Sequence, residues 1–201
     1  MKTSHYFSVI LITFFMTAFV CGQKNNSVKD YLNVPGPVTF SGVSYYLSWT
    51  SHPEKSFYKQ EYIAEGDNLE KFKTLVMLDA VTGGADIKEV VKRKTTELEK
   101  MKQINPVVNY ETFEKDGEYM IDFLLYENSD DGKSVSIAER NVYRYKTITD
   151  KSGQNAVLLF GISTRSYGDD IDNFLKDLKA TRKNLTNEVA KFNIPEVTFS
   201  E

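Results

Sequence analysis

The stretch FYKQEYIAEGDNLEKFKTLVMLDAV, residues 57–81, organises the predicted fold. Residues 57–64 are rich in aromatic side chains and predict a strand. The sequence EGDN ends this strand, and Asn68 is a candidate cap for a short helical turn. Residues 75–81 form either a continuation of that turn as helix or a buried strand, because periodicity does not separate the two in so short a run. Their β-branched residues favour the strand.

Two amphipathic helices are predicted further along the chain. The first covers residues 86–103, because Asp86 and Glu89 have the spacing of a capping box and Pro106 disfavours helix just before it. The second begins near Asp169, the predicted N-cap. Its inner apolar stripe consists of Ile171, Phe174, Leu175, Leu178, Leu185, Val189 and Phe192.

The other predicted strands are joined by tight turns, which makes neighbouring strands antiparallel. They are residues 38–40, 43–50, 107–114, 119–127, 135–148 and 156–164. The alternation of apolar and polar residues slips within residues 135–148, which predicts a β-bulge near residues 139–141. Each helix has one apolar stripe and should cover sheet. We therefore expect an α+β fold, an antiparallel sheet of about six to seven strands flanked by two amphipathic helices, in a single domain over residues 37–201.

One local motif and the order of the segments suggest a family. The motif is Glu61-Tyr62-Ile63 followed by Gly66-Asp67-Asn68-Leu69. It comes after an early hairpin, and it is followed by a helix, a strand meander and a C-terminal helix. This arrangement, over residues 38–192, resembles the PsbP-like α/β/α sandwich and is similar to small exported bacterial proteins of that fold. The resemblance implies the sandwich and no catalytic residues. Photosynthetic members of the family are extrinsic assembly or stabilising subunits, a role that we do not carry over.

The first 22 residues predict a secretory signal peptide, with Lys2 before an apolar run of residues 7–20. The run is shorter than the ~20 residues that span a bilayer as a helix. Cleavage after Gly22 would release a periplasmic or secreted protein. In the alternative, Cys21 is lipidated and the protein is an envelope-anchored lipoprotein, although Val20 fits poorly before such a cysteine. Residues 23–36 are polar and predict a tether.

Composition and motifs exclude several classes of function. The net charge of -3 gives no support for nucleic-acid binding. Cys21 is the only cysteine, so the mature domain has no disulfide. The only histidine beyond the signal peptide is His52, which cannot form a two-histidine metal site. The chain has no GxSxG, GxGxxG or Walker motif, and we expect no catalytic residues, metal or cofactor.

Aromatic side chains in two adjacent strands are the strongest functional signal. Half of them should face the core, and the others could form an exposed patch that binds a partner. The residues proposed for this patch are Tyr46, Tyr58 and Tyr62, with the loop around His52. The first hypothesis is therefore an exported, non-enzymatic binding or assembly module of the bacterial cell envelope. Its partner is an unknown protein or a small ligand, and it would meet a membrane only through a lipid on Cys21.

Two other functions stay open. A carboxylate-based enzyme needs two Asp or Glu side chains at roughly 5–10 Å in one cleft. A small hydrophobic ligand could instead be carried between the sheet and a helix. Asp122 lies on a strand that should pair with the strand carrying Glu139, Arg140 and Arg144. We interpret these charges as a surface ion pair on the solvent face, with a ligand-binding polar patch as the alternative.

Overall fold

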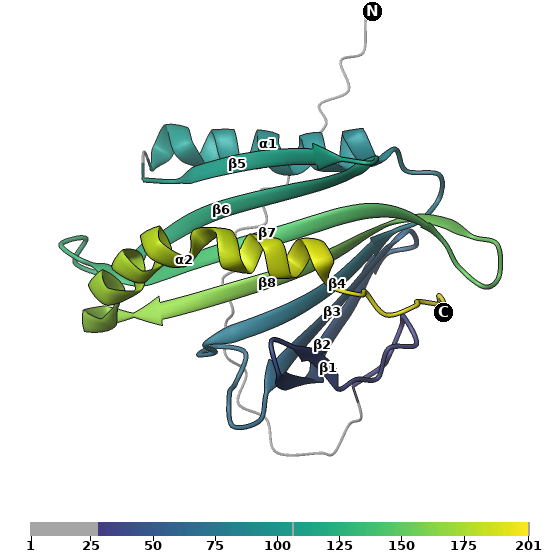
Figure 1. Ribbon diagram of the computed structural model, residues 1–201, viewed down its shortest axis with the longest axis horizontal. Coiled ribbons are helices and arrows are strands. Elements are labelled where there is room, and N and C mark those ends of the chain that lie inside the picture. The colour runs from purple at the N-terminus through teal and green to yellow at the C-terminus, as the bar shows by residue number, and fades with distance from the viewer. Residues whose placement is uncertain (1–27, 106, 201) are drawn as a thin grey trace, which may run out of the picture.

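The computed structural model describes residues 28–105 and 107–200. The predicted signal peptide, Cys21 and the first part of the tether lie outside the described residues, as does Pro106. The described chain forms one antiparallel sheet of eight strands in the order β1-β2-β3-β4-β8-β7-β6-β5 (Figure 1). The strands are β1 Val38–Phe40, β2 Val43–Glu54, β3 Phe57–Ala64, β4 Thr74–Val81, β5 Asn109–Lys115, β6 Glu118–Asn128, β7 Val135–Thr149 and β8 Asn155–Tyr167.

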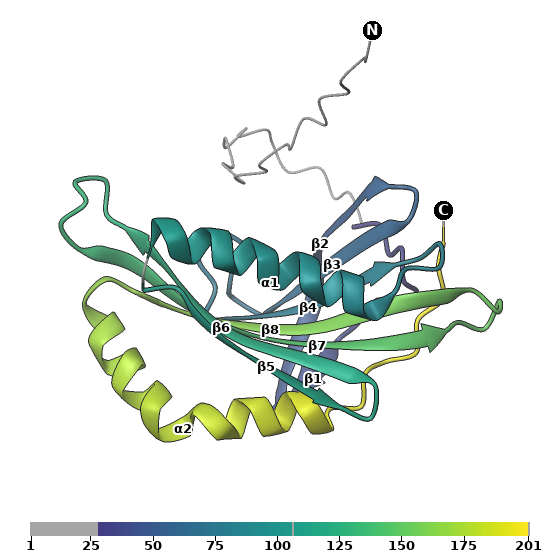
Figure 2. The ribbon, with the colours of Figure 1, turned by 90° about the horizontal axis from the view of Figure 1, so that it is seen from above.

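The expected PsbP-like sandwich with six to seven strands is wrong. The described chain is mostly sheet: eight strands curl into a half-barrel, and only two α-helices accompany them (Figure 2). The strand count fell short because residues 75–81 were compatible with helix or strand. They lie in β4, between β3 and β8, and side chains on both faces of this run are buried in hydrophobic clusters. A strand buried on both faces reads as a continuous apolar run and loses its alternation.

The two helices lie on opposite faces of the sheet (Figure 2). Side chains alternate along β4, and Val76 and Leu78 pack in one cluster with Val189 of α2, Ile171–Lys191. Leu75 and Met77 pack in a second cluster with residues of α1, Ile87–Ile104. The period of two therefore divides one sheet between two hydrophobic cores.

The predicted bulge near residues 139–141 is also wrong. β7 pairs with β8 without a register shift from Ile137 to Thr149. A register shift is found instead between Glu127 and Asn128, where β6 meets the start of β7. The apolar phase appeared to slip because Arg140 and Asn141 are both buried, on opposite faces of the same strand. Polar residues inside both cores give the sequence pattern of a bulge.

The helix starts differ in their capping. The Asp86 carboxylate caps α1 by accepting from the backbone N–H of Lys88 at 3.0 Å. At α2 a short 3₁₀ turn, η1 Gly168–Asp170, comes first, so the N-cap is Asp170 rather than the predicted Asp169, and its side chain makes no capping hydrogen bond. Residues 69–71 bend without forming a helix, but Asn68 Oδ1 accepts from the backbone N–H of Lys71 at 2.7 Å, as the predicted cap would.

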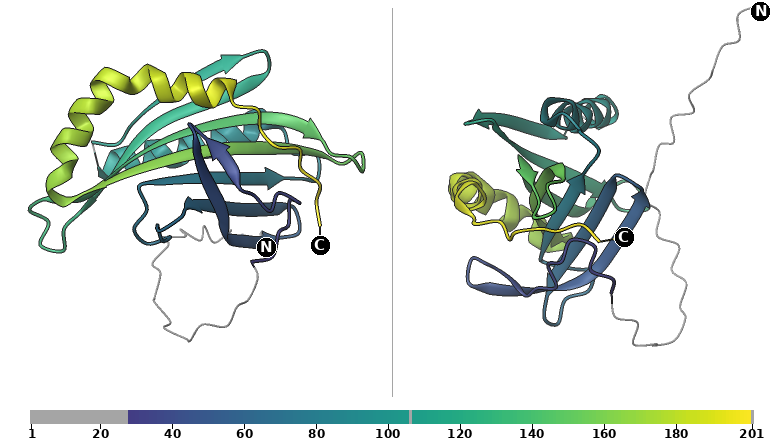
Figure 3. Two further views of the ribbon diagram at one scale, coloured as in Figure 1. Left: turned by 60° about the horizontal axis from the view of Figure 1, so that its bottom comes forward. Right: turned by 90° about the vertical axis from the view of Figure 1, so that its right-hand side faces the viewer.

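Both ends of the described chain pack onto the sheet. Leu32 and Val34, which the sequence assigned to the tether, are buried in the core on the α2 side. After α2 an extended tail runs back to them (Figure 3), and the backbone N–H of Thr198 donates to the Leu32 carbonyl at 3.0 Å. The folded unit therefore includes part of the predicted tether and the C-terminal tail.

Candidate functional site

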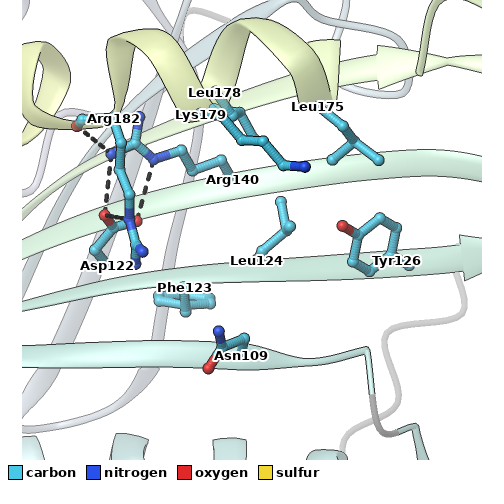
Figure 4. Close-up of a pocket in the computed structure, with 10 residues that line it drawn as sticks. All are labelled: Asn109, Asp122, Phe123, Leu124, Tyr126, Arg140, Leu175, Leu178, Lys179 and Arg182. Atoms are coloured by element: carbon cyan, nitrogen blue, oxygen red, sulfur yellow. Dashed lines mark hydrogen bonds and ion pairs between the residues drawn. The ribbon is translucent and has the colours of Figure 1, made fainter. Parts of the chain in front are cut away.

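A pocket of about 310 Å³ lies between α2 and strands β5, β6 and β7 (Figure 4). We call it the α2 pocket. Helix α2 contributes Leu175, Leu178, Lys179 and Arg182, and the sheet contributes Asn109, Asp122, Phe123, Leu124, Tyr126 and Arg140. Its volume lies at the small end of the range for ligand sites in proteins.

The α2 pocket exists because the first half of α2 is not packed closely onto the sheet. Val189, near the end of the helix, is fully buried, whereas Leu175 and Leu178 are only half-buried. Leu124 and Tyr126 on β6 are half-buried as well and line the same space. Protein interiors normally fill such space with side chains, so apolar walls around an unfilled volume are typical of a binding site.

One end of the α2 pocket is closed by a buried ion pair. Asp122 and Arg140 are each 3% exposed. The Arg140 guanidinium donates from Nε to Asp122 Oδ1 at 3.1 Å and from Nη2 to Oδ2 at 3.0 Å. The expected ion pair on the solvent face is therefore wrong in its location, because α2 covers this part of the sheet. A buried pair of this kind needs good geometry to offset its desolvation.

The same ion pair attaches α2 to the sheet. Arg182 of the helix donates from Nε to Asp122 Oδ2 at 3.1 Å and pairs through Nη1 with Glu111 of β5 at 3.1 Å. In return, Arg140 Nη2 donates to the Arg182 backbone carbonyl at 2.7 Å and to Thr186 Oγ1 at 3.2 Å. These contacts join β5, β6 and β7 to the middle of the helix. They fix the end of the pocket at which Arg182 lies.

Lys179 is the cation in the lining that no such contact engages. Its side chain is exposed and makes no ion pair or hydrogen bond within the described part of the chain. In Figure 4 its ammonium end extends along the pocket, away from Arg182 and toward the side where Tyr126 lies. The Tyr126 hydroxyl points back toward the centre of the pocket. Burial raises the pKa of Tyr126 above its ordinary value, so this hydroxyl keeps its proton at neutral pH and can donate it to a hydrogen bond.

The four residues predicted to bind a partner do not form one exposed patch. Tyr46 is 47% exposed, but Tyr58 is 5% exposed and Tyr62 is fully buried. The Tyr62 hydroxyl donates to the Val34 carbonyl at 2.7 Å, and burial raises its pKa. His52 is half-buried, and its ring stacks on Tyr58 with 4.2 Å between ring centroids. Of the four, Tyr46 is therefore the exposed side chain and His52 is half-buried.

Asp79 of β4, whose side chain is 13% exposed, is a largely buried carboxylate on the opposite face of the sheet that the sequence did not reveal. Its Oδ2 lies 4.0 Å from Lys59 Nζ, and its Oδ1 has no hydrogen-bond partner. Burial raises the pKa of Asp79 to about 7, and the neighbouring Glu61 carboxylate adds to the rise. The available signal was an aspartate inside the apolar run LVMLDAV. Such a position places the carboxylate in a protein interior, where the charged form is disfavoured.

The linings of the α2 pocket and of a second pocket each contain one carboxylate. The carboxylate that lines the α2 pocket, Asp122, is engaged by Arg140 and Arg182, and a second pocket between α1 and β5 has Glu114 as its one carboxylate. Neither pocket therefore holds the pair that a carboxylate mechanism needs. Over residues 28–105 and 107–200 no group of three or more potential ligands is placed to hold a metal ion. The helices described are too short or too polar to cross a membrane.

Comparison with known proteins gives one relationship. Residues 32–194, most of the chain and all of the α2 pocket, match the model of an uncharacterised protein family. No curated protein and no solved structure matches the chain. The match does not show the PsbP-like relationship expected from the sequence. Because it covers far more than half of the chain, the protein belongs to this uncharacterised family.

Proposed function

We propose that this protein is a non-catalytic binding protein that carries a small apolar ligand in the α2 pocket. The observation behind the proposal is that Leu124, Leu175 and Leu178 face about 310 Å³ of space that no side chain fills. Binding of an apolar ligand removes this uncovered apolar surface from water, which lowers the free energy of the complex. Of the three functions considered from the sequence, carriage of a ligand between the sheet and a helix is the one that this geometry favours.

Export is part of the proposal. Residues 1–22 would direct the protein out of the cytoplasm, and the carrier would then work in the periplasm, outside the cell or on the envelope. The mass of the mature protein purified from its membrane and soluble fractions distinguishes these cases. A chain that begins at Gln23 indicates a soluble carrier, and a lipid-bearing mass at Cys21 indicates an anchored one.

Filling the α2 pocket tests the proposal directly. In Leu178→Trp the larger side chain occupies the pocket, whereas Ala180→Trp places the same side chain at an exposed position of α2. We expect 1-octanol, a small apolar probe, to bind the wild type and Ala180→Trp in isothermal titration calorimetry and not to bind Leu178→Trp. Circular dichroism confirms that each variant is folded.

Two results would overturn the proposal. If octanol does not bind the wild type, the pocket does not take a small apolar ligand. If Leu178→Trp binds octanol as well as Ala180→Trp does, the apolar site lies elsewhere. A native ligand that is released by denaturation and seen by mass spectrometry would identify the natural occupant.

A further inference from the structure

We infer that the ligand of the α2 pocket is an amphipathic carboxylate, with its carboxylate bound by Lys179 and Tyr126 and its chain along the leucines. This inference rests on the proposed function and adds the chemical class of the ligand. It assigns a role to two polar groups in the lining, the Lys179 ammonium and the Tyr126 hydroxyl, that make no side-chain hydrogen bond within the described residues.

The charge of the lining favours an anion. Three cationic side chains, Arg140, Arg182 and Lys179, line the α2 pocket together with one carboxylate, Asp122. These four groups sum to a net charge of about plus two, and the Glu111 carboxylate that pairs with Arg182 lowers the local charge to about plus one. A site for a neutral apolar ligand has no need of this excess, whereas the carboxylate of a ligand neutralises it.

The two arginines are already engaged. Arg140 donates three hydrogen bonds to Asp122 and the Arg182 carbonyl and a fourth to Thr186. Arg182 is held between Asp122 and Glu111. A ligand that took either guanidinium would break contacts that attach α2 to the sheet. Lys179 can be approached without breaking a contact of the described residues.

The position of Lys179 suits an amphipathic molecule. It follows Leu178 directly and lies one helical turn after Leu175, so the cation and both leucines face the same pocket. The ammonium group carries three donors on a flexible stem, and the Tyr126 hydroxyl offers a fourth donor from the opposite wall. A carboxylate between the two walls would accept from both, while its chain covers Leu124, Leu175 and Leu178.

Octanoate and 1-octanol test the inference, because they share an apolar chain and differ in headgroup charge. We expect the wild type to bind octanoate about fivefold more tightly than octanol in calorimetry, the ratio for one weak ion pair. Lys179→Met should remove this preference, so that octanoate and octanol bind the variant equally. Tyr126→Phe should reduce the preference by a smaller factor. The matched control is Lys183→Met, an exposed lysine on the same helix that does not line the pocket, which should leave both affinities unchanged.

Each failure has a distinct meaning. If octanol and octanoate bind the wild type equally, the inference is overturned and the proposed function stands. If neither binds, the proposed function fails as well. If Lys183→Met lowers octanoate binding as much as Lys179→Met does, the effect comes from general charge and the assignment to Lys179 is overturned. Circular dichroism of all variants excludes loss of folding as the cause.

Discussion

The carboxylate of Asp79 lies where charged groups are rarely found, on a central strand of the sheet. The neighbouring strand β3 places Lys59 and Glu61 beside it, and Lys94 approaches from α1. Burial dominates these charges and raises the pKa of Asp79 to about 7, because desolvation disfavours the ionised form. The folded protein therefore binds a proton that the unfolded chain has already released at the same pH.

This difference in proton binding predicts how stability depends on pH. The carboxyl of the unfolded chain titrates near the ordinary aspartate pKa of 3.8, so between about pH 4 and pH 7 the folded state holds the additional proton and stability falls as the pH rises. We expect Asp79→Asn to remove this fall. Between pH 4 and pH 8 the free energy of unfolding should fall by about 2 to 4 kcal/mol more in the wild type than in the variant. Each unit of difference between the folded and unfolded pKa is worth roughly 1.36 kcal/mol. Urea unfolding at pH 4, 5.5 and 8 measures it.

The exposed aspartate Asp130, in the turn after β6, provides the control. Asp130→Asn should keep the pH dependence of the wild type. Identical curves for the wild type and Asp79→Asn would show that the folded carboxyl titrates normally, and the prediction would then be wrong.

Single-residue burial was the least predictable feature of this chain. Alternation along β3 correctly implies two faces, but it does not show whether either face is exposed to solvent. In the structure both faces of this sheet are covered. Tyr58 and Tyr62 are buried by segments that the sequence placed outside the core: Tyr62 bonds to Val34, and Phe199 of the tail packs 5.2 Å from Tyr58 between ring centroids. Contacts between residues so far apart in the chain leave no local signal in the sequence.

At the level of elements, the helices were predicted well and their caps only in part. The predicted helix over residues 86–103 corresponds to α1 at Ile87–Ile104. The inner stripe predicted for the second helix lies in α2 except for Phe192, which is the C-cap. A stripe shows which side of a helix faces the sheet, but it does not give the separation between them. That separation depends on Asp122, Arg140 and Arg182, and it creates the α2 pocket. The pocket therefore could not be located from helical periodicity.

The two helix starts allow a matched test of capping. Asp86 accepts from the Lys88 N–H at 3.0 Å, and Asp170 makes no side-chain capping bond. We expect Asp86→Ala to lower the free energy of unfolding by about 1 kcal/mol, the usual cost of losing an N-cap. Asp170→Ala should cost only a few tenths, roughly the interaction of its charge with the helix dipole. Urea denaturation measures both, and an equal loss in the two variants would contradict this prediction.

At the level of the whole molecule, the sheet is completed by the two ends of the described chain. Val34 near the start and Val197 near the end belong to the same hydrophobic cluster as the central strands. The tail also adds backbone hydrogen bonds, since the N–H of Ser200 donates to the Tyr31 carbonyl at 2.9 Å. A signal for such closure is weak in the sequence, because short extended segments without a partner strand nearby in the chain resemble linkers. The family match ends at residue 194, before this tail.

Removing residues 195–201 should therefore destabilise the whole sheet. The truncation exposes the surface that Val197 and Phe199 cover and removes the bonds from the tail to Tyr31 and Leu32. Burial of a single valine is worth about 1.5–3 kcal/mol, so we expect a loss of about 2–4 kcal/mol in urea unfolding. The control is Glu196→Gln, since Glu196 pairs with Lys151 at the exposed surface and its loss should change stability by less than about 0.5 kcal/mol. If the truncated chain unfolds at the urea concentration of the wild type, the tail contributes nothing to the core, and the burial of Tyr58 must be maintained by β2, β3 and the first described residues alone.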